Sequence, residues 1–496
     1  MSSIEVPYEK IQDLKDKAGK ISELLKGLEE NLVIICKVNP DNLCAAGILV
    51  SCLREIGLGC HIIFIDNNSD LDERIKKINY LTYIFIGFQL KELPSKLLKD
   101  EAKNIIIIGN KITIDKRLKL PWDNILTLSL KELEIPAIAL SNAGLAYFIA
   151  KDFTEDYPKF SGLAVVGGLA NKQVDSKSQE LIGINRFILD EGKEEEILEE
   201  SKGTKISGRE SLPIHLALKY SINPYFPGLT GNEEACTSFV SKLKIPMKKD
   251  GDWRTFSSLA KDETQILFEK LTILLVERNS QFRIDSLFGT NYIILTETSK
   301  SQTRDAEEYL WLLEGACQIK KYGLALAVIL GDRTNLYDEL KRKMENYHGK
   351  AAQIIEKIAQ DSGIVESKEY YRIIKNQEIF DLESAPLVMK ALVESNIITI
   401  EIPLLLHLKE ANMNYLYMHD SPTQIQKGFQ IYHFFKDLVK EKTIAESCFK
   451  GESEFFRLAL SDEEYPVVLE EFEKALEKHH EGTKAEVNSK KKEDDK

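Results

Sequence analysis

The first third of the chain alternates short apolar runs with segments of helical periodicity. We interpret these runs as strands: residues 32–36, 61–66, 83–86, 105–108, 125–128 and 164–166. Residues 43–56 have helical spacing, and Gly57 and Gly59 stand where a C-cap is expected. Continuous apolar strands separated by helices are typical of a sheet covered on both faces. The pattern therefore predicts an α/β fold with a mostly parallel sheet.

From about residue 190 the pattern becomes mainly helical, and after residue 363 strands return. Thr230 and Glu233 have the spacing of a capping box. The expected helices are residues 263–279, 304–321, 336–360 and 462–479, and residues 324–330 fit either a strand or a helix. The expected later strands are residues 371–374, 397–402, 404–407 and 415–418. We expect an α/β domain over 1–188, a mainly helical insertion and connecting helix over 189–362, a smaller α/β domain over 363–480 and a disordered charged tail over 481–496.

Composition narrows the class of protein. Apolar residues make up 43% of the 496 residues, which is ordinary for a globular chain. The sequence has neither a long apolar run nor a basic, apolar leader at its start, so we expect a cytoplasmic protein without membrane contact. Its seven cysteines form no Cys-x-x-Cys pair, which argues against a zinc site. A net charge of −13 favours protein partners over duplex DNA.

The most informative segment follows the first expected strand. Residues 36–47 read Cys-Lys-Val-Asn-Pro-Asp-Asn-Leu-Cys-Ala-Ala-Gly and join this strand to a helix, at the edge of an α/β sheet where ligands bind. The segment resembles the first motif of the DHH phosphoesterase superfamily, His-x-Asp-x-Asp-Gly-x-x-Ala-Ala. Lys37 stands for its His, Asn39 for its first Asp and Asn42 for its Gly, whereas Asp41 is retained.

Further motifs of this superfamily follow in order. Gly87 stands where the second motif has an Asp, and residues 107–111 resemble the Asp-His-His motif. Residues 141–147 resemble the helix that follows, and residues 166–171 resemble the fourth motif with Asn171 for its Asp. The likeness identifies an α/β domain of the DHH type.

Segments further along the chain narrow the resemblance. Residues 226–235 and 304–308 are similar to archaeal RecJ-like proteins, a group that includes the GINS-associated nuclease and is related to CDC45. Beyond residue 360 the likeness is weak. The DHH-associated domain carries a Gly-Gly-His-x-x-Ala-Ala-Gly segment, for which residues 450–453 are the nearest candidate. The chain therefore resembles a catalytically degenerate, CDC45-like branch of this family, with a degenerate DHH-associated domain over 363–480.

The resemblance implies a metal site that this sequence has lost. Members of the family hold two manganese or magnesium ions with Asp and His, and such ions prefer anionic oxygen or imidazole ligands. Asp41 alone keeps a ligand of the family type. The mapped positions are Lys37, Asn39, Asp41, Gly87, Gly109, Asn110, Lys111 and Asn171. We therefore predict no bound metal, no cofactor and no catalysis.

Three functions stay open. The resemblance implies a non-catalytic archaeal replication factor that binds GINS and the MCM helicase within the replicative helicase complex. The alternatives are a metal-dependent single-strand DNA exonuclease of the RecJ type and a stand-alone single-strand DNA-binding protein. For the last, residues 341–343 with Tyr347 are the nearest basic and aromatic cluster, although a solvated helix face explains them too. Lys37 and Lys111 either hold a DNA phosphate or are solvated or paired with Asp41.

Overall fold

A computed structural model gives the fold. It describes residues 4–66, 70–89, 93–94, 97, 104–112, 125–277, 287–375, 379–395, 397–398, 402–419, 430–441, 444–445, 448–452 and 455–494. Within these ranges, no helix is both long and apolar enough to cross a membrane. The chain divides into two compact units. The first comprises residues 1–217, 247–260 and 284–345, and the second comprises residues 218–246, 261–283 and 346–496.

A parallel sheet forms the centre of the first unit, with the strand order β2-β1-β3-β4-β5. Its strands are β1 (Leu32–Lys37), β2 (Cys60–Ile65), β3 (Thr82–Ile86), β4 (Asn104–Ile108) and β5 (Ile125–Leu128). Val33 in β1 lies beside His61 of β2 and Tyr83 of β3. The expected mostly parallel sheet is confirmed, because each of these strands occurs where the apolar runs predict it.

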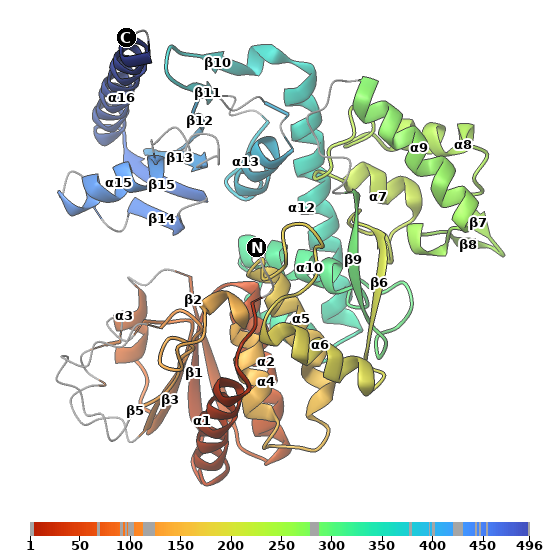
Figure 1. Ribbon diagram of the computed structural model, residues 1–496, viewed down its shortest axis with the longest axis vertical. Helices are drawn as coiled ribbons and strands as arrows, with labels where there is room; N and C mark the ends of the chain where they lie inside the picture. The colour runs from red at the N-terminus through yellow and green to blue at the C-terminus, as the bar shows by residue number, and fades with distance from the viewer. Residues whose placement is uncertain are drawn as a thin grey trace. The chain divides into compact units, whose positions relative to one another are not determined.

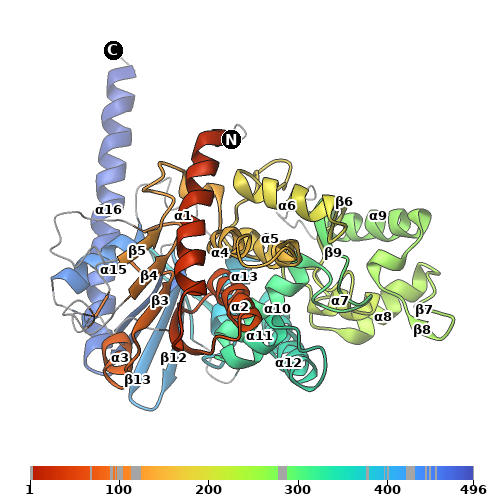
Figure 2. The ribbon, with the colours of Figure 1, turned by 90° about the horizontal axis from the view of Figure 1, so that it is seen from below.

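Helices cover both faces of this sheet, as its apolar strands require. On one face, Val33, Ile35 and Ile63 pack with Leu71 and Ile75 of α3 (Leu71–Lys76). On the other, α2 (Pro40–Glu55) contacts β1 and β3, and α4 (Asn142–Ala150) contacts β4. α1 (Tyr8–Lys26) and α5 (Ser161–Ala170) pack against α4, as Figure 1 and Figure 2 show.

The prediction of a strand at residues 164–166 is wrong, because this segment lies within α5. Its residues are almost all buried, so the sequence carries no polar face from which a helical period is legible. α5 contacts α2, α4, α6 (Ile184–Glu194) and α10 (Ala306–Gln318). Gly167 and Gly168 allow close approach to α4 and α6: a Cβ built on Gly167 would lie 2.6 Å from the Ala143 Cβ, and one built on Gly168 would lie 3.3 Å from the Asn185 side chain.

The expected helical middle region also contains strands. β6 (Leu198–Thr204) and β9 (Phe288–Ile294) pair antiparallel, with Thr204 opposite Phe288. Residues 206–287 form the long connection from β6 to β9. Helices α7 (Ile214–Tyr220), α8 (Glu233–Lys242) and α9 (Lys261–Glu277) and the hairpin β7 (Lys248–Lys249) and β8 (Asp252–Trp253) belong to this segment. The expected capping box is corrected too: Asn232, not Thr230, caps α8, since its side chain accepts from the Ala235 amide.

The second unit is built on a mixed sheet with the order β10-β11-β12-β13-β15-β14. Its strands are β10 (Val365–Ser367), β11 (Arg372–Ile374), β12 (Leu404–Glu410), β13 (Met413–His419), β14 (Phe449–Glu452) and β15 (Phe455–Ser461). One core joins α12 (Asn335–Gln360) and α13 (Ala385–Glu394) to the sheet, and another joins α15 (Ile431–Lys440) and α16 (Glu464–Asp494). α16 continues to Asp494, so the backbone of residues 481–494, which we expected to be a disordered tail, is helical.

Other details correct or refine the expectations. Residues 324–330, left open between strand and helix, form α11 (Tyr322–Ile329). Of the expected strand 397–402, the described residues Ile397, Ile398 and Ile402 belong to no strand, and the remainder lies outside the described part of the chain. The expected middle domain, 189–362, is shared between the two units.

Candidate functional site

The mapped motif positions meet at the carboxyl ends of three neighbouring strands. Lys37 ends β1, Gly87 follows β3, and Gly109 and Asn110 follow β4. Because parallel strands end at one edge of the sheet, these positions lie together. A Cβ built on Gly109 lies 3.9 Å from the Gly87 Cα, which places the two glycines side by side. The structure therefore brings these mapped positions together at one edge of the sheet.

Asp41 lies at the centre of this site and is 2% exposed. Its carboxylate accepts hydrogen bonds from the Asn142 amide at 2.9 Å and the Ala143 amide at 2.8 Å, both in the first turn of α4. It also accepts from the Asn171 Nδ2 at 2.5 Å, at the end of α5. The helix N-terminus favours this anion through its free N–H groups. The protein itself therefore supplies three donors to the carboxylate.

A chain of buried amides extends from Asp41 across the strand ends. Asn42 donates its Nδ2 to the Lys37 carbonyl at 2.8 Å, and its Oδ1 accepts from the Asn142 Nδ2 at 2.6 Å. The Asn142 Oδ1 in turn accepts from the Asn110 backbone amide at 2.7 Å. The Asn110 side chain then donates to the carbonyls of Ala137 and Leu140. Each side-chain amide thus has a protein partner.

Gly87 and Asn42 are complementary in shape. Gly87 has a φ of +81°, and a Cβ at this position lies 2.2 Å from the Asn42 Nδ2. The DHH motifs that this chain resembles have the opposite arrangement, an Asp at position 87 and a Gly at position 42. The Asn42 amide therefore occupies the volume into which a side chain at position 87 projects. Space for a metal-binding Asp is filled by a neutral amide.

Burial raises the pKa of Asp41 to about 6, while the hydrogen bonds from Ala143, Asn142 and Asn171 partly oppose this shift. The donors stabilise the ionised form, yet removal from water dominates. Two divalent ions require a second carboxylate or a His beside Asp41. The groups that contact the Asp41 carboxylate are instead amides, which donate hydrogen bonds and cannot bind a cation through N–H. The described residues contain no cluster of His, Cys, Asp or Glu suited to a metal. The residues present do not fit the metal pair of the DHH family that the sequence motifs resemble.

The remaining mapped residues lie at the rim. Asn39 caps α2, accepting from the Asn42 amide at 2.7 Å. The Lys37 ammonium lies 5.9 Å from the centre of the Phe88 ring. Lys111 is exposed, and its carbonyl accepts from the Gln89 side chain at 2.8 Å.

Sequence reasoning missed Ser141 and Asn142 as members of the site. The signal was present, because a Ser-Asn pair precedes a run of small apolar residues. Ser141 caps α4 by accepting from the Gly144 amide at 2.9 Å, and this cap presents the first-turn amides to Asp41. The N–H groups at the N-terminus of α4 therefore bind the Asp41 carboxylate of the same chain.

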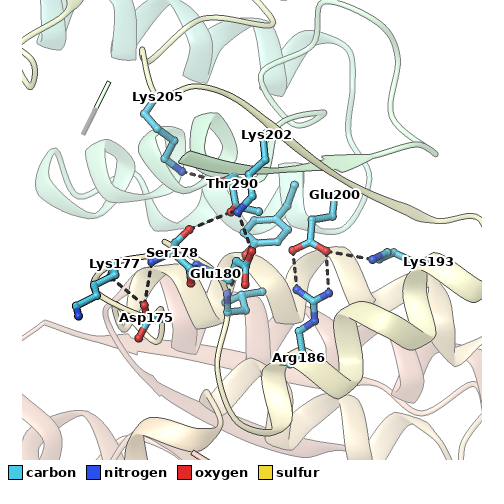
Figure 3. A network of polar contacts seen from close by, with 12 residues as sticks. Asp175, Lys177, Ser178, Glu180, Arg186, Lys193, Glu200, Lys202, Lys205 and Thr290 are labelled. Atoms are coloured by element: carbon cyan, nitrogen blue, oxygen red, sulfur yellow. Dashed lines mark hydrogen bonds and ion pairs between the residues drawn. The ribbon is translucent and has the colours of Figure 1, made fainter. Parts of the chain in front are cut away.

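The loop after Asn171 is fixed by a network of polar contacts, drawn in Figure 3. Arg186 and Lys193 both bind the Glu200 carboxylate, Arg186 with two hydrogen bonds of 2.6 and 2.8 Å. Lys202 donates to Glu180 at 2.7 Å and to the Thr290 hydroxyl at 2.6 Å. These basic side chains are therefore paired with carboxylates, and they attach the β6–β9 pair to the loop and to α6.

The basic cluster at residues 341–343 does not form an aromatic-lined groove. Tyr347 is only 6% exposed, so its ring is not available to stack on a base. The Lys343 Nζ lies 3.5 Å from the Oε1 of Glu339, one helical turn away. Arg342 is exposed. The structure supports the interpretation of these residues as a solvated helix face.

Comparisons with known proteins identify chains of similar fold and one matching segment. A family model described as the DHH-CID domain matches residues 206–288. CDC45 from Entamoeba histolytica has a TM-score of 0.60 and 13% identity, covering 95% of this chain and 98% of its own. This chain has the fold of CDC45 and RecJ. RecJ from Thermus thermophilus in complex with Mn²⁺ has a TM-score of 0.52 and 14% identity, covering 95% of this chain and 55% of its own.

A second RecJ structure, an exonuclease bound to manganese, has a TM-score of 0.50 and 12% identity, covering 92% of this chain and 91% of its own. No curated protein matches the chain in sequence. The likeness of fold to CDC45 and RecJ, with the DHH-CID match over residues 206–288, confirms the predicted resemblance to these proteins. The matched DHH-CID segment is also the one enclosed by β6 and β9.

Proposed function

We propose that this protein is a non-catalytic DNA replication factor resembling CDC45, which binds GINS and the MCM helicase as part of the replicative helicase complex. The observation that supports the loss of catalysis is the buried Asp41 carboxylate, which already accepts hydrogen bonds from Asn142, Ala143 and Asn171. The similarity to CDC45 over 98% of that chain supports the choice of relative.

The charge of the site supports this proposal. Two-metal hydrolysis of a phosphodiester needs ligands that offset the charge of two dications and leave room for attacking and leaving oxygens. The site offers one buried carboxylate, whose pKa burial already raises to about 6. A metal ion at Asp41 has to displace three hydrogen bonds, each worth about 0.5–1.5 kcal/mol or more to a charged acceptor. Loss of catalysis leaves the fold available as a binding platform.

The protein partners are tested by size-exclusion chromatography with light scattering. The full chain, mixed with GINS from the same source at micromolar concentration, is expected to elute as one stable complex. An MCM hexamer added to this complex is expected to retain both proteins. Separate elution of the chain from GINS contradicts the proposed function, whatever the state of the metal site.

Catalysis is tested independently. We expect no Mn²⁺- or Mg²⁺-dependent hydrolysis of labelled single-stranded DNA, and no heat of Mn²⁺ binding above that of an Asp41→Ala variant. The variant serves as a matched control, since it removes the one retained carboxylate. Hydrolysis by the wild type that this variant abolishes establishes the RecJ-type exonuclease instead.

A further inference from the structure

β2 is an outermost strand whose free edge is not covered by any strand in the described part of the chain. The Ile65 carbonyl accepts from Val38 in the connection after β1, and the Gly59 carbonyl accepts from Leu32. In a parallel pair the peptide groups of alternate residues point to the neighbouring strand. Those of Ile62 and Phe64 therefore point away from the sheet, toward its open edge.

A cavity of about 380 Å³ runs along this edge. It is lined by His61, Ile62, Ile63, Phe64, Arg74, Lys77 and Tyr322. Exposed strand edges are usually protected by proline, by charged residues, by a bulge or by a covering element. β2 reads Cys-His-Ile-Ile-Phe-Ile and contains neither a proline nor a Lys, Arg, Asp or Glu. At the other edge of the sheet, α1 contacts β5.

The two walls of this cavity differ in chemistry. Arg74 and Lys77 come from α3 and the residue after it, on the sheet face where α3 packs over Ile63. On the opposite face the Phe64 and Tyr322 rings lie 5.6 Å apart between centroids. Side chains of a strand that pairs with β2 alternate between these two walls. One set therefore meets cations and the other meets aromatic rings.

We propose that the open edge of β2 is a docking site for an extended segment of a partner protein, in which acidic and apolar residues alternate and which adds to the sheet as a further strand. Main-chain hydrogen bonds to Ile62 and Phe64 supply affinity, and the two walls supply specificity. Lys77 already pairs with Glu73 at 3.1 Å, but both side chains are more than two-thirds exposed. Such an exposed pair contributes little, so an acidic partner replaces it readily. This inference does not depend on the loss of catalysis.

Hydrogen–deuterium exchange of the full-length protein tests the geometry. The Ile62 and Phe64 amides are expected to exchange quickly, whereas the Ile63 amide, which points toward β1, exchanges slowly. Addition of a synthetic peptide of about eight alternating aspartate and valine residues is expected to slow the Ile62 and Phe64 amides at least about tenfold. Equal protection of all three amides in the free protein contradicts an open edge.

Charge reversal tests the partner chemistry. The double variant Arg74→Glu/Lys77→Glu is expected to weaken binding of the labelled peptide at least about fivefold. Lys76→Glu is the matched control, since Lys76 is exposed on the same helix but does not line the cavity. An Ile62→Pro variant removes one outward N–H without touching the ladder to β1, and it too is expected to weaken binding.

Three results overturn the proposal. The first is no binding of the acidic peptide at millimolar concentration, and the second is equal binding of a lysine–valine peptide. The third is a dimer in light scattering that Ile62→Pro dissociates, because a second copy of this chain then occupies the edge. Circular dichroism melting curves identify any variant that loses its fold. None of these outcomes depends on GINS binding, so they are distinguishable from failure of the proposed function.

Discussion

Substitution of Gly87 by alanine measures how tightly the amide network fills the site. Gly87 has a φ of +81°, and Gly57 has a φ of +74° with no atom within 4 Å of an added Cβ. The left-handed conformation costs a non-glycine residue about 1–2 kcal/mol at either position. Gly57→Ala is therefore a control that carries the backbone strain alone.

At Gly87 the added Cβ also collides with the Asn42 Nδ2, 2.2 Å away. The Asn42 side chain is 1% exposed and makes hydrogen bonds to Lys37 and Asn142, each worth about 0.5–1.5 kcal/mol. We expect Gly87→Ala to lower the free energy of unfolding by about 2–5 kcal/mol, compared with about 1–2 kcal/mol for Gly57→Ala.

A double-mutant cycle with Asn42→Gly isolates the collision. Asn42→Gly alone loses both hydrogen bonds and places a glycine in α2, which costs about 1 kcal/mol more. Once Asn42 is a glycine, Gly87→Ala retains only the backbone strain, so a coupling energy of about 1–3 kcal/mol is expected. Urea denaturation followed by circular dichroism and tryptophan fluorescence gives these values. Additivity within about 0.5 kcal/mol, or equal costs at Gly57 and Gly87, refutes the reasoning.

Further predictions concern charge. Burial raises the pKa of Asp41 to about 6, so a carboxyl carbon titration by NMR is expected to have its midpoint near pH 6. Because this pKa lies above the ordinary value of 3.8, protonated Asp41 contributes to the stability of the folded state fully below pH 3.8, and this contribution is lost as the pH rises through about 6. A titration midpoint near 4 contradicts the burial argument. Burial and the nearby Asp305 raise the pKa of Glu308 above its ordinary 4.5, so the folded state loses stability as the pH rises above 4.5. Glu308→Gln is expected to reduce the loss of unfolding free energy between pH 5 and 8. An unchanged pH dependence in this variant contradicts the role of Glu308. If the rim lysines hold a DNA phosphate, Lys37→Ala/Lys111→Ala weakens single-strand DNA binding and reduces its salt slope by about 1.4; unchanged affinity and slope in filter-binding titrations exclude that role.

The failed strand prediction shows where periodicity stops being informative. Residues 32–36 and 164–166 are both short apolar runs, yet the first is a strand and the second lies in a helix. A segment buried on every side has no polar positions that reveal its period. Only the packing of α5 among α2, α4, α6 and α10 decides its conformation. The glycines and alanines of α5 permit that packing, but they do not by themselves specify it.

The β6–β9 pair was missed for a different reason. Residues 198–204 read Leu-Glu-Glu-Ser-Lys-Gly-Thr, a polar segment with weak strand propensity. Its strand conformation depends on β9, whose paired residues are about 90 positions further along the chain, and on ion pairs such as Arg186–Glu200. Contacts between residues so distant in sequence leave no local pattern.

From the sequence alone we predicted the parallel sheet, which the structure confirms, and the positions at which a DHH-type metal site has lost its ligands, which stays a prediction. Both predictions depend on local hydrophobic patterns and on residue types at fixed positions. The sequence did not reveal that Asn42 occupies the space of a side chain at position 87, or that Asp41 is held by the first turn of α4. The tertiary structure decided those points, since Asp41 and Asn142 are 101 residues apart and meet only when the sheet and its helices pack together.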